Sequence, residues 1–155
     1  MPTPEEIETA ELFLRKAASD LAAARALAGD AAQDDDVVGF HAQQAVEKAL
    51  KAVVVVLSLE IPRSHDLGLL IRLLELAEVE LPIEVREADW LNPWAVTLRY
   101  DHPGGELDRA LAVGVADKTL VWARERIDAP REMRVAADEL PRPKGDEPVE
   151  DSDAR

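Results

Sequence analysis

Residues 40–52, with the sequence FHAQQAVEKALKA, decide the fold of this chain. When successive residues are placed about 100° apart, as in an α-helix, the apolar side chains of this stretch fall on one arc. The periodicity continues through the valines at 53–56 and therefore predicts one helix over residues 36–59, not a buried strand. The apolar arc consists of Ala42, Ala45, Val46, Ala49, Leu50, Val53, Val56 and Leu57.

The opposite arc of this predicted helix carries His41, Gln44, Lys48 and Lys51, which follow one another at helical spacing. An ordinary solvated helix face has the same appearance, because Glu47 and Lys51 make a stabilising pair four residues apart. Residue types alone therefore leave this row either as a solvated surface or as a face that contacts a ligand.

The segments on either side of this helix also have the pattern of helices. Thr3 with Glu6 three residues later predicts a capping box, and the apolar spacing that follows continues to Gly29. After a connection, Ser64 is the expected N-cap of a third helix over residues 65–77.

The remaining part of the chain predicts two further helices. One begins near Ile83 and is interrupted by Pro93, with Asn92 able to cap the restart. The last helix covers residues 106–126. Because no strand alternation persists anywhere, the predicted fold is all-α, an up-and-down bundle of about five helices.

The end of the chain differs from the rest in composition. Residues 129–155 are acidic and rich in proline and show almost no apolar periodicity, which predicts a disordered tail. The tail contributes −3 to the net charge of −14, so residues 1–128, the predicted helical domain, carry −14 − (−3) = −11.

Composition excludes several classes of function. The chain has 155 residues and no cysteine, which rules out disulfides, a thiol nucleophile and a cysteine-ligated metal. The acidic N-terminus lacks a signal-peptide pattern, and the longest apolar run, residues 52–57, is far too short for a membrane span. We therefore expect a cytoplasmic protein without membrane contact. The negative charge disfavours a protein that coats nucleic acid.

Motifs of common enzyme classes are also missing. Gly104-Gly105 lacks the Lys-Ser/Thr continuation of a phosphate-binding loop, and no serine lies in a Gly-x-Ser-x-Gly turn. The three histidines, at 41, 65 and 102, do not form an HExxH pair. We expect no metal and no cofactor.

Three segments in order resemble the HEPN domain family: residues 40–52, SHDL at 64–67 and LRY at 98–100. The resemblance covers about residues 12–126 and implies an up-and-down helical bundle that is commonly a homodimer. It also implies a link to nucleotide or RNA chemistry, because members are often found beside minimal nucleotidyltransferases in prokaryotes. The predicted partners are thus a second copy, a nucleotidyltransferase-type protein, and a nucleotide or RNA ligand.

The resemblance gives the polar residues candidate roles in binding. Lys48 and Lys51 can donate to phosphate oxygens, and Arg99 can hold a phosphate with two hydrogen bonds. Tyr100 can stack on a base. Arg99 can equally pair with an acid and lock the junction between the last two helices.

Three further residues remain open between a binding and a structural role. His41 either lines an anion site or faces solvent, and His65 either packs in the first turn of its helix or contacts a ligand. Gln44, with Gln43, either cross-links neighbouring helices by amide hydrogen bonds or contacts a ligand.

Catalytic candidates are Arg99 and His102, because many HEPN proteins are ribonucleases that use an Arg followed by a His. In those enzymes the spacing is longer than here, where only Tyr100 and Asp101 intervene. Pro103 also disfavours helical geometry at His102. The segment is closer to a branch with an Arg-Tyr-Pro signature, although Asp101 replaces that proline.

The sequence therefore predicts a HEPN-type binding module, associated with a nucleotide or RNA and part of a nucleotidyltransferase-linked toxin–antitoxin or defence pair. The alternative is an enzyme instead of a binding module, namely a metal-independent ribonuclease of the HEPN toxin type. A structural helical adaptor is a further alternative.

Overall fold

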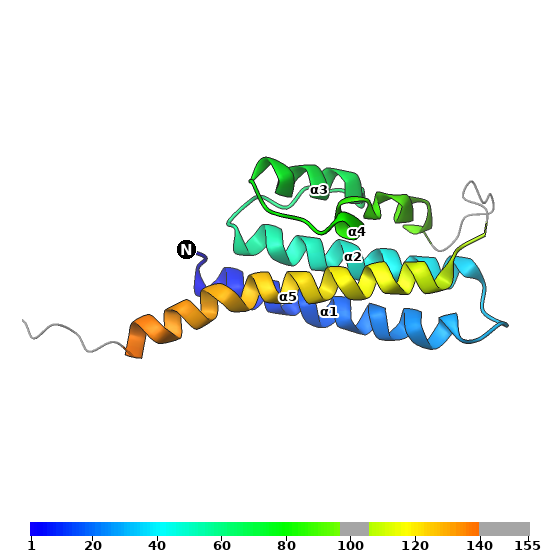
Figure 1. The fold of residues 1–155 in the computed structure, drawn as a ribbon, viewed down its shortest axis with the longest axis horizontal. Helices are drawn as coiled ribbons and strands as arrows, with labels where there is room; N and C mark the ends of the chain where they lie inside the picture. Colours follow the sequence, from blue (N-terminus) through cyan, green and yellow to red (C-terminus); the bar gives the residue numbers. More distant parts are fainter. Residues whose placement is uncertain (97–105, 140–155) are drawn as a thin grey trace, which may run out of the picture.

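The computed structural model describes residues 1–96 and 106–139, with side chains up to residue 129, and within these ranges the regular structure is entirely helical. Figure 1 shows three long helices side by side, α1 (Pro4–Ala28), α2 (Asp35–Val56) and α5 (Arg109–Glu139). The shorter elements α3 (Leu67–Leu76), α4 (Ile83–Arg86) and the 3-10 helix η1 (Ala88–Trp94) form a second layer. This layer covers the side of α2 that faces away from α1 (Figure 1). The all-α bundle is confirmed.

The start of α1 follows directly from its sequence. Thr3 Oγ1 accepts a hydrogen bond from the Glu6 backbone N–H at 3.1 Å, and Glu6 Oε2 accepts from the Thr3 N–H at 2.7 Å. This reciprocal pair is the predicted capping box. The helix ends at Ala28, and Gly29 is its C-cap.

Helix α2 is the centre of the molecule and is helical through all four valines at 53–56, as the periodicity predicts. It packs against α1 and α5 on one side and against α3 and η1 on the other. Because neighbours lie on both sides, buried residues occur outside the predicted apolar arc as well. Gln43 and Glu47, both polar, are among them.

Two predicted caps are wrong, Ser64 for the third helix and Asn92 for a restart at Pro93. Asp66, not Ser64, is the N-cap: its Oδ1 accepts from the Gly68 N–H at 2.8 Å. Asn92 does not cap a helix restart, since Pro93 lies inside η1. Instead, Asn92 Oδ1 accepts from the Leu67 N–H at 2.9 Å and its Nδ2 donates to Asp66 Oδ1 at 2.9 Å. A contact between residues so far apart in sequence cannot be read from local capping patterns.

Helix α5 begins later and ends later than the sequence predicts. It continues to Glu139, so the expected boundary between residues 128 and 129 falls inside a helix, and residues 129–139 of the predicted tail are helical. The reason is local: the stretch REMRVAADE at 131–139 consists mostly of good helix formers. In Figure 1 the end of α5 projects beyond the bundle at the end where the N-terminus lies. Residues 140–155 lie outside the described residues.

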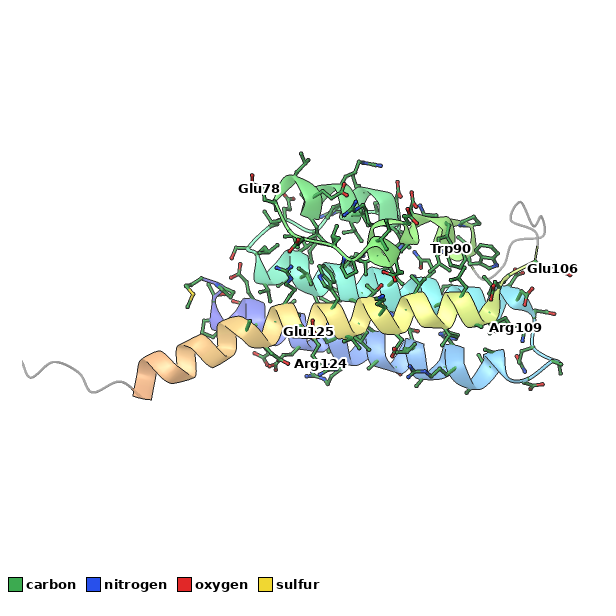
Figure 2. All side chains as sticks on the ribbon, in the orientation of Figure 1. Glu78, Trp90, Glu106, Arg109, Arg124 and Glu125 are labelled. Atoms are coloured by element: carbon green, nitrogen blue, oxygen red, sulfur yellow. The ribbon has the colours of Figure 1, made fainter. Side chains whose placement is uncertain are left out.

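Arg109 fixes the start of α5 to the connection between α1 and α2, at the end of the bundle where Figure 2 labels it. Its Nε donates to Asp35 Oδ1 at 2.7 Å, and its Nη1 donates to the carbonyl of Asp30 at 3.1 Å. A third hydrogen bond joins Nη2 to the carbonyl of Gln33. The Leu107 N–H donates to Asp35 Oδ2 at 3.1 Å. These bonds fasten the start of α5 to the connection between α1 and α2, beside the buried side chain of Leu107.

Gly39 in α2 allows a direct test of how tightly η1 packs on that helix, and Gly114 in α5 provides a control. A Cβ built on Gly39 would lie 2.3 Å from Trp94 Cδ1, and Trp94 is itself buried against Trp90 at a centroid distance of 6.2 Å. A Cβ on Gly114 in α5 would meet nothing within 4 Å.

We predict that Gly39→Ala lowers the free energy of unfolding by about 1–3 kcal/mol, because the methyl group overpacks against Trp94. Gly114→Ala should raise it by about 0.5–1 kcal/mol, since alanine removes the helix penalty of an exposed glycine. Urea unfolding of both variants measures the difference. Equal stability of Gly39→Ala and the native protein would contradict this packing of Trp94.

Candidate functional site

Five of the predicted site residues meet two carboxylates along α2. His41, Gln44, Lys48 and Lys51 form the polar row of this helix, and His65 approaches it from the connection to α3. We call these five residues, with the acids Asp20 and Glu47 and the amide of Gln43, the polar face of α2. It divides into two clusters, each built around one carboxylate.

The first cluster is centred on Asp20, which α1 contributes. The ammonium group of Lys48 donates to Asp20 Oδ2, and His41 Nδ1 lies 2.9 Å from Asp20 Oδ1. The Asp20 side chain is only 13% exposed, against 25% for Lys48 and 28% for His41. The cluster thus ties α1 to α2 through a largely desolvated ion pair that remains accessible from one side.

The second cluster is centred on Glu47, whose side chain is 4% exposed. Lys51 Nζ donates to Glu47 Oε1 at 2.7 Å, which confirms the expected pair four residues apart. His65 Nδ1 lies 3.1 and 3.2 Å from the two carboxylate oxygens. Gln43 Nε2 donates to Glu47 Oε2 and to the His65 carbonyl, both at 3.1 Å, and Gln44 Nε2 lies 3.3 Å from Glu47 Oε2.

Glu47 stays ionised although it is buried. Burial alone would raise the pKa of Glu47, but the hydrogen bond and positive charge of Lys51 and the hydrogen bonds from Gln43 and His65 outweigh it. The pKa of Glu47 is therefore lower than its ordinary value. At neutral pH the centre of this cluster is a carboxylate, not a carboxylic acid.

The two clusters repeat one chemical arrangement. In each, a carboxylate binds one lysine ammonium and one histidine Nδ1: Asp20 with Lys48 and His41, and Glu47 with Lys51 and His65. A neutral imidazole that donates from Nδ1 to a carboxylate has its Nε2 free to accept a hydrogen bond or a proton. The His65 side chain is 74% exposed, so its ring is accessible to a ligand while its orientation is held by a buried partner.

Buried charges of this kind are weak stabilisers of a fold. Removing two ions from water costs several kcal/mol each, and well-packed apolar residues in their place are often equally stable or better. Clusters of buried titratable groups are therefore enriched at functional sites, although structural ion pairs also occur. The polar face of α2 is the best candidate site in the described part of the chain.

The sequence interpretation located part of this site. It named His41, Gln44, Lys48, Lys51 and His65, which the fold brings together at the two carboxylates. It missed Asp20, because the register of α1 on α2 has no local sequence signal. It anticipated the pair of Lys51 with Glu47 but gave Lys48 no partner, whereas the structure places Lys48 in an ion pair with Asp20. Arg99, Tyr100 and His102 lie outside the described residues.

Other features of the described residues do not form a second site of this kind. No group of three or more His, Asp or Glu side chains among them is arranged to hold a metal ion. A cavity of about 480 Å³ near the N-terminus is lined mainly by apolar residues such as Val53, Val56 and Ala129, and it includes no member of the polar face of α2. No helix in residues 1–96 and 106–139 is long and apolar enough to cross a membrane.

Comparison with known families gives one match. The model of the family described as HEPN domain matches residues 10–131, most of the chain, and this range includes every residue of the polar face of α2. Neither the curated proteins nor the solved structures gave a match.

We predict that Glu47→Gln lowers the free energy of unfolding by about 3 kcal/mol at neutral pH, because Lys51 then lacks its counter-charge in a buried position. The effect is pH-dependent. The folded-state pKa of Glu47 lies below the unfolded value of about 4.3, so its ionisation stabilises the fold above that pH. This contribution disappears as pH falls through the folded-state pKa, and urea unfolding between neutral and acid pH measures it.

The matched control for this prediction is Glu84→Gln. Glu84 also pairs with a lysine, Lys118 at 2.6 Å, but both side chains are more than two-fifths exposed. Solvent screening makes such a pair weak, so this variant should change stability much less than Glu47→Gln does. Equal effects of the two substitutions would mean that the burial of Glu47 has no energetic consequence.

Proposed function

This chain belongs to the HEPN domain family, and on that premise we propose that it is a binding module for a nucleotide or RNA that contacts its ligand along the polar face of α2. The observation that carries the proposal is the repeated cluster of carboxylate, lysine and imidazole on one helix. An isolated pair would be an ordinary structural contact. Two such clusters, both partly accessible through their histidines, fit a surface that exchanges hydrogen bonds with a ligand.

Paired lysines can still contact a phosphate. An ammonium group has three N–H donors, and Asp20 receives one of those of Lys48, whose side chain is a quarter exposed. His65 adds Nε2 as an acceptor when neutral and as a donor when protonated. In this proposal the carboxylates orient the lysine and imidazole groups, and the ligand binds the donors that remain.

The second candidate is a metal-independent ribonuclease of the HEPN toxin type, and one observation favours it. Such cleavage needs a general base to take the proton of a ribose hydroxyl, and an imidazole held at Nδ1 by a carboxylate is suited to that role. The spacing of Arg99 and His102 and the strongly acidic composition count against it, because a negative surface repels RNA. We therefore place the binding module first and the ribonuclease second.

The proposal includes partners and a setting. We propose that the protein is a cytoplasmic homodimer and that it acts with a nucleotidyltransferase-type protein in a toxin–antitoxin or defence pair, as members of its family do. Half-exposed Leu111 and Val121 on α5 are apolar surface that a second copy can cover. A purely structural adaptor is the reading that remains if no nucleotide or RNA binds.

We predict saturable binding of ATP, GTP or a short RNA, measured by titration calorimetry of the native protein. Substituting Asp20→Asn and Lys48→Gln together removes one ion pair without leaving a buried charge, and should weaken binding about tenfold, equivalent to about 1.4 kcal/mol. His65→Gln should weaken binding without unfolding the protein, because the side chain is largely exposed.

The control for this titration is Lys118→Gln, which removes a lysine paired with Glu84 outside the polar face of α2. This variant should bind the nucleotide or RNA with the same affinity as the native protein. If no ligand gives heat at millimolar concentration, the adaptor reading replaces the binding module.

We predict that the isolated protein does not cleave total RNA efficiently, with or without a chelator. An efficient site needs a base, an acid for the leaving oxygen and a cation for the charged phosphorane, and the Arg99–His102 spacing does not fit that set. Gel analysis of incubated RNA checks this. Cleavage that survives EDTA and is lost in both Arg99→Ala and His102→Ala would establish the ribonuclease instead.

A further inference from the structure

Helix α3 is apolar on more sides than its position in the fold requires. Seven of its ten residues are Leu or Ile, and four of them, Leu67, Leu70, Ile71 and Leu74, are buried in the core. A helix at the surface normally carries polar residues on the side away from the core. In α3 that side carries leucines beside the exposed charged residues Arg72 and Glu75.

The additional leucines form one row. Leu69, Leu73 and Leu76 follow each other at spacings of four and three residues, so they lie on one side of the helix. Leu73 is partly buried, Leu69 is 38% exposed and Leu76 is 83% exposed. Figure 1 shows that α3 lies in the outermost layer of the molecule, opposite α1. Single exposed leucines are common, but a row on a short, outermost helix is characteristic of a surface that contacts another molecule.

Acidic residues border this row. Glu75, Glu78 and Glu80 line a hollow of about 360 Å³ beside α3, together with Val79, Leu81 and Arg86. Arg86 Nε lies 3.7 Å from Glu75 Oε1, and Arg126 Nη2 donates to the Glu80 carbonyl at 3.1 Å, so three glutamates meet two arginines there. Figure 2 shows Glu78 at the end of α3, on the outside of the bundle. The C-terminal end of α3 adds its own partial negative charge at this place.

The charge at this surface decides which kind of partner fits. Residues 67–87 contain five glutamates and two arginines, and the whole chain carries −14. A second copy placed against this surface would bring the two sets of glutamates together, which opposes association. A partner with positive charges beside an apolar strip satisfies both the leucines and the glutamates.

We propose that the outer face of α3, defined as Leu69, Leu73 and Leu76 with Glu75, Glu78 and Glu80, docks a protein segment that presents an apolar helix face flanked by lysine or arginine. Apolar side chains of the segment cover the leucine row, and a basic side chain enters the hollow between the glutamates. The surface shares no residue with the polar face of α2, so ligand binding and protein docking are separate properties of the chain.

The test uses a defined probe and the full-length protein. A synthetic helical peptide of about 18 residues, with leucine at every third or fourth position and lysine beside it, is titrated by fluorescence anisotropy. Two control peptides have glutamate in place of lysine or the same composition in scrambled order. We expect saturable binding of the basic amphipathic peptide alone, weakened by added salt because the charges are exposed.

Variants of the protein locate the binding. Leu76→Gln changes a side chain that is almost fully exposed, so it leaves the fold intact and should weaken binding about fivefold to tenfold. Glu78→Lys should weaken it at least as much and remove part of the salt dependence. Leu111→Gln changes a half-exposed leucine on α5 and should leave the affinity unchanged.

Three results of the peptide titrations would overturn the proposal. These are the absence of binding at a peptide concentration of about 100 μM, equal affinity for the glutamate peptide, and equal affinity of Leu76→Gln and the native protein. Light scattering of the native protein and of Leu76→Gln tests whether a second copy of this chain occupies the outer face of α3. A dimer that dissociates in this variant would assign the surface to a second copy and would also overturn the proposal. None of these outcomes depends on whether a nucleotide or RNA binds.

Discussion

The burial of α2 is the constraint on which the rest of the structure depends. Long helices cover one side of it, and the layer of α3 and η1 covers the other. A helix enclosed in this way cannot leave a charge without a partner, because an unpaired ion in a desolvated place costs several kcal/mol. Glu47 and Lys51 therefore pair with each other, and Lys48 pairs with Asp20 of α1. The charges on α2 consequently fix how its neighbours are placed.

Each of the two polar clusters also joins α2 to another element. The Asp20 cluster fixes the register of α1 on α2, and the Glu47 cluster holds the connection to α3 through both the ring and the carbonyl of His65. A few residues further on, Asp66 and Asn92 join the start of α3 to η1. The contacts that join α1 and the connection to α3 to α2 therefore also hold two imidazoles in defined orientations. Structural and chemical roles coincide in these side chains.

The acidity of the chain limits how it can engage partners. Long-range attraction favours basic proteins over nucleic acid, since the net charge is −14. In the function that we propose, an anionic ligand is recognised at short range, by donors that carboxylates hold in place along α2. The outer face of α3, with leucines beside glutamates, has the opposite preference and suits a basic protein segment. One small domain thus presents two surfaces of different chemistry.

The sequence by itself determined the helical fold and the row His41, Gln44, Lys48 and Lys51, because helical periodicity and capping boxes are local properties of the chain. It also pointed to the family that the comparison found. The tertiary structure alone decided that His41 and Lys48 pair with Asp20 and that Asn92 binds Leu67 and Asp66 at the start of α3. The contacts of Asp20 and of Asn92 join residues more than twenty positions apart. Their geometry depends on how helices pack, and no local pattern in the sequence encodes that packing.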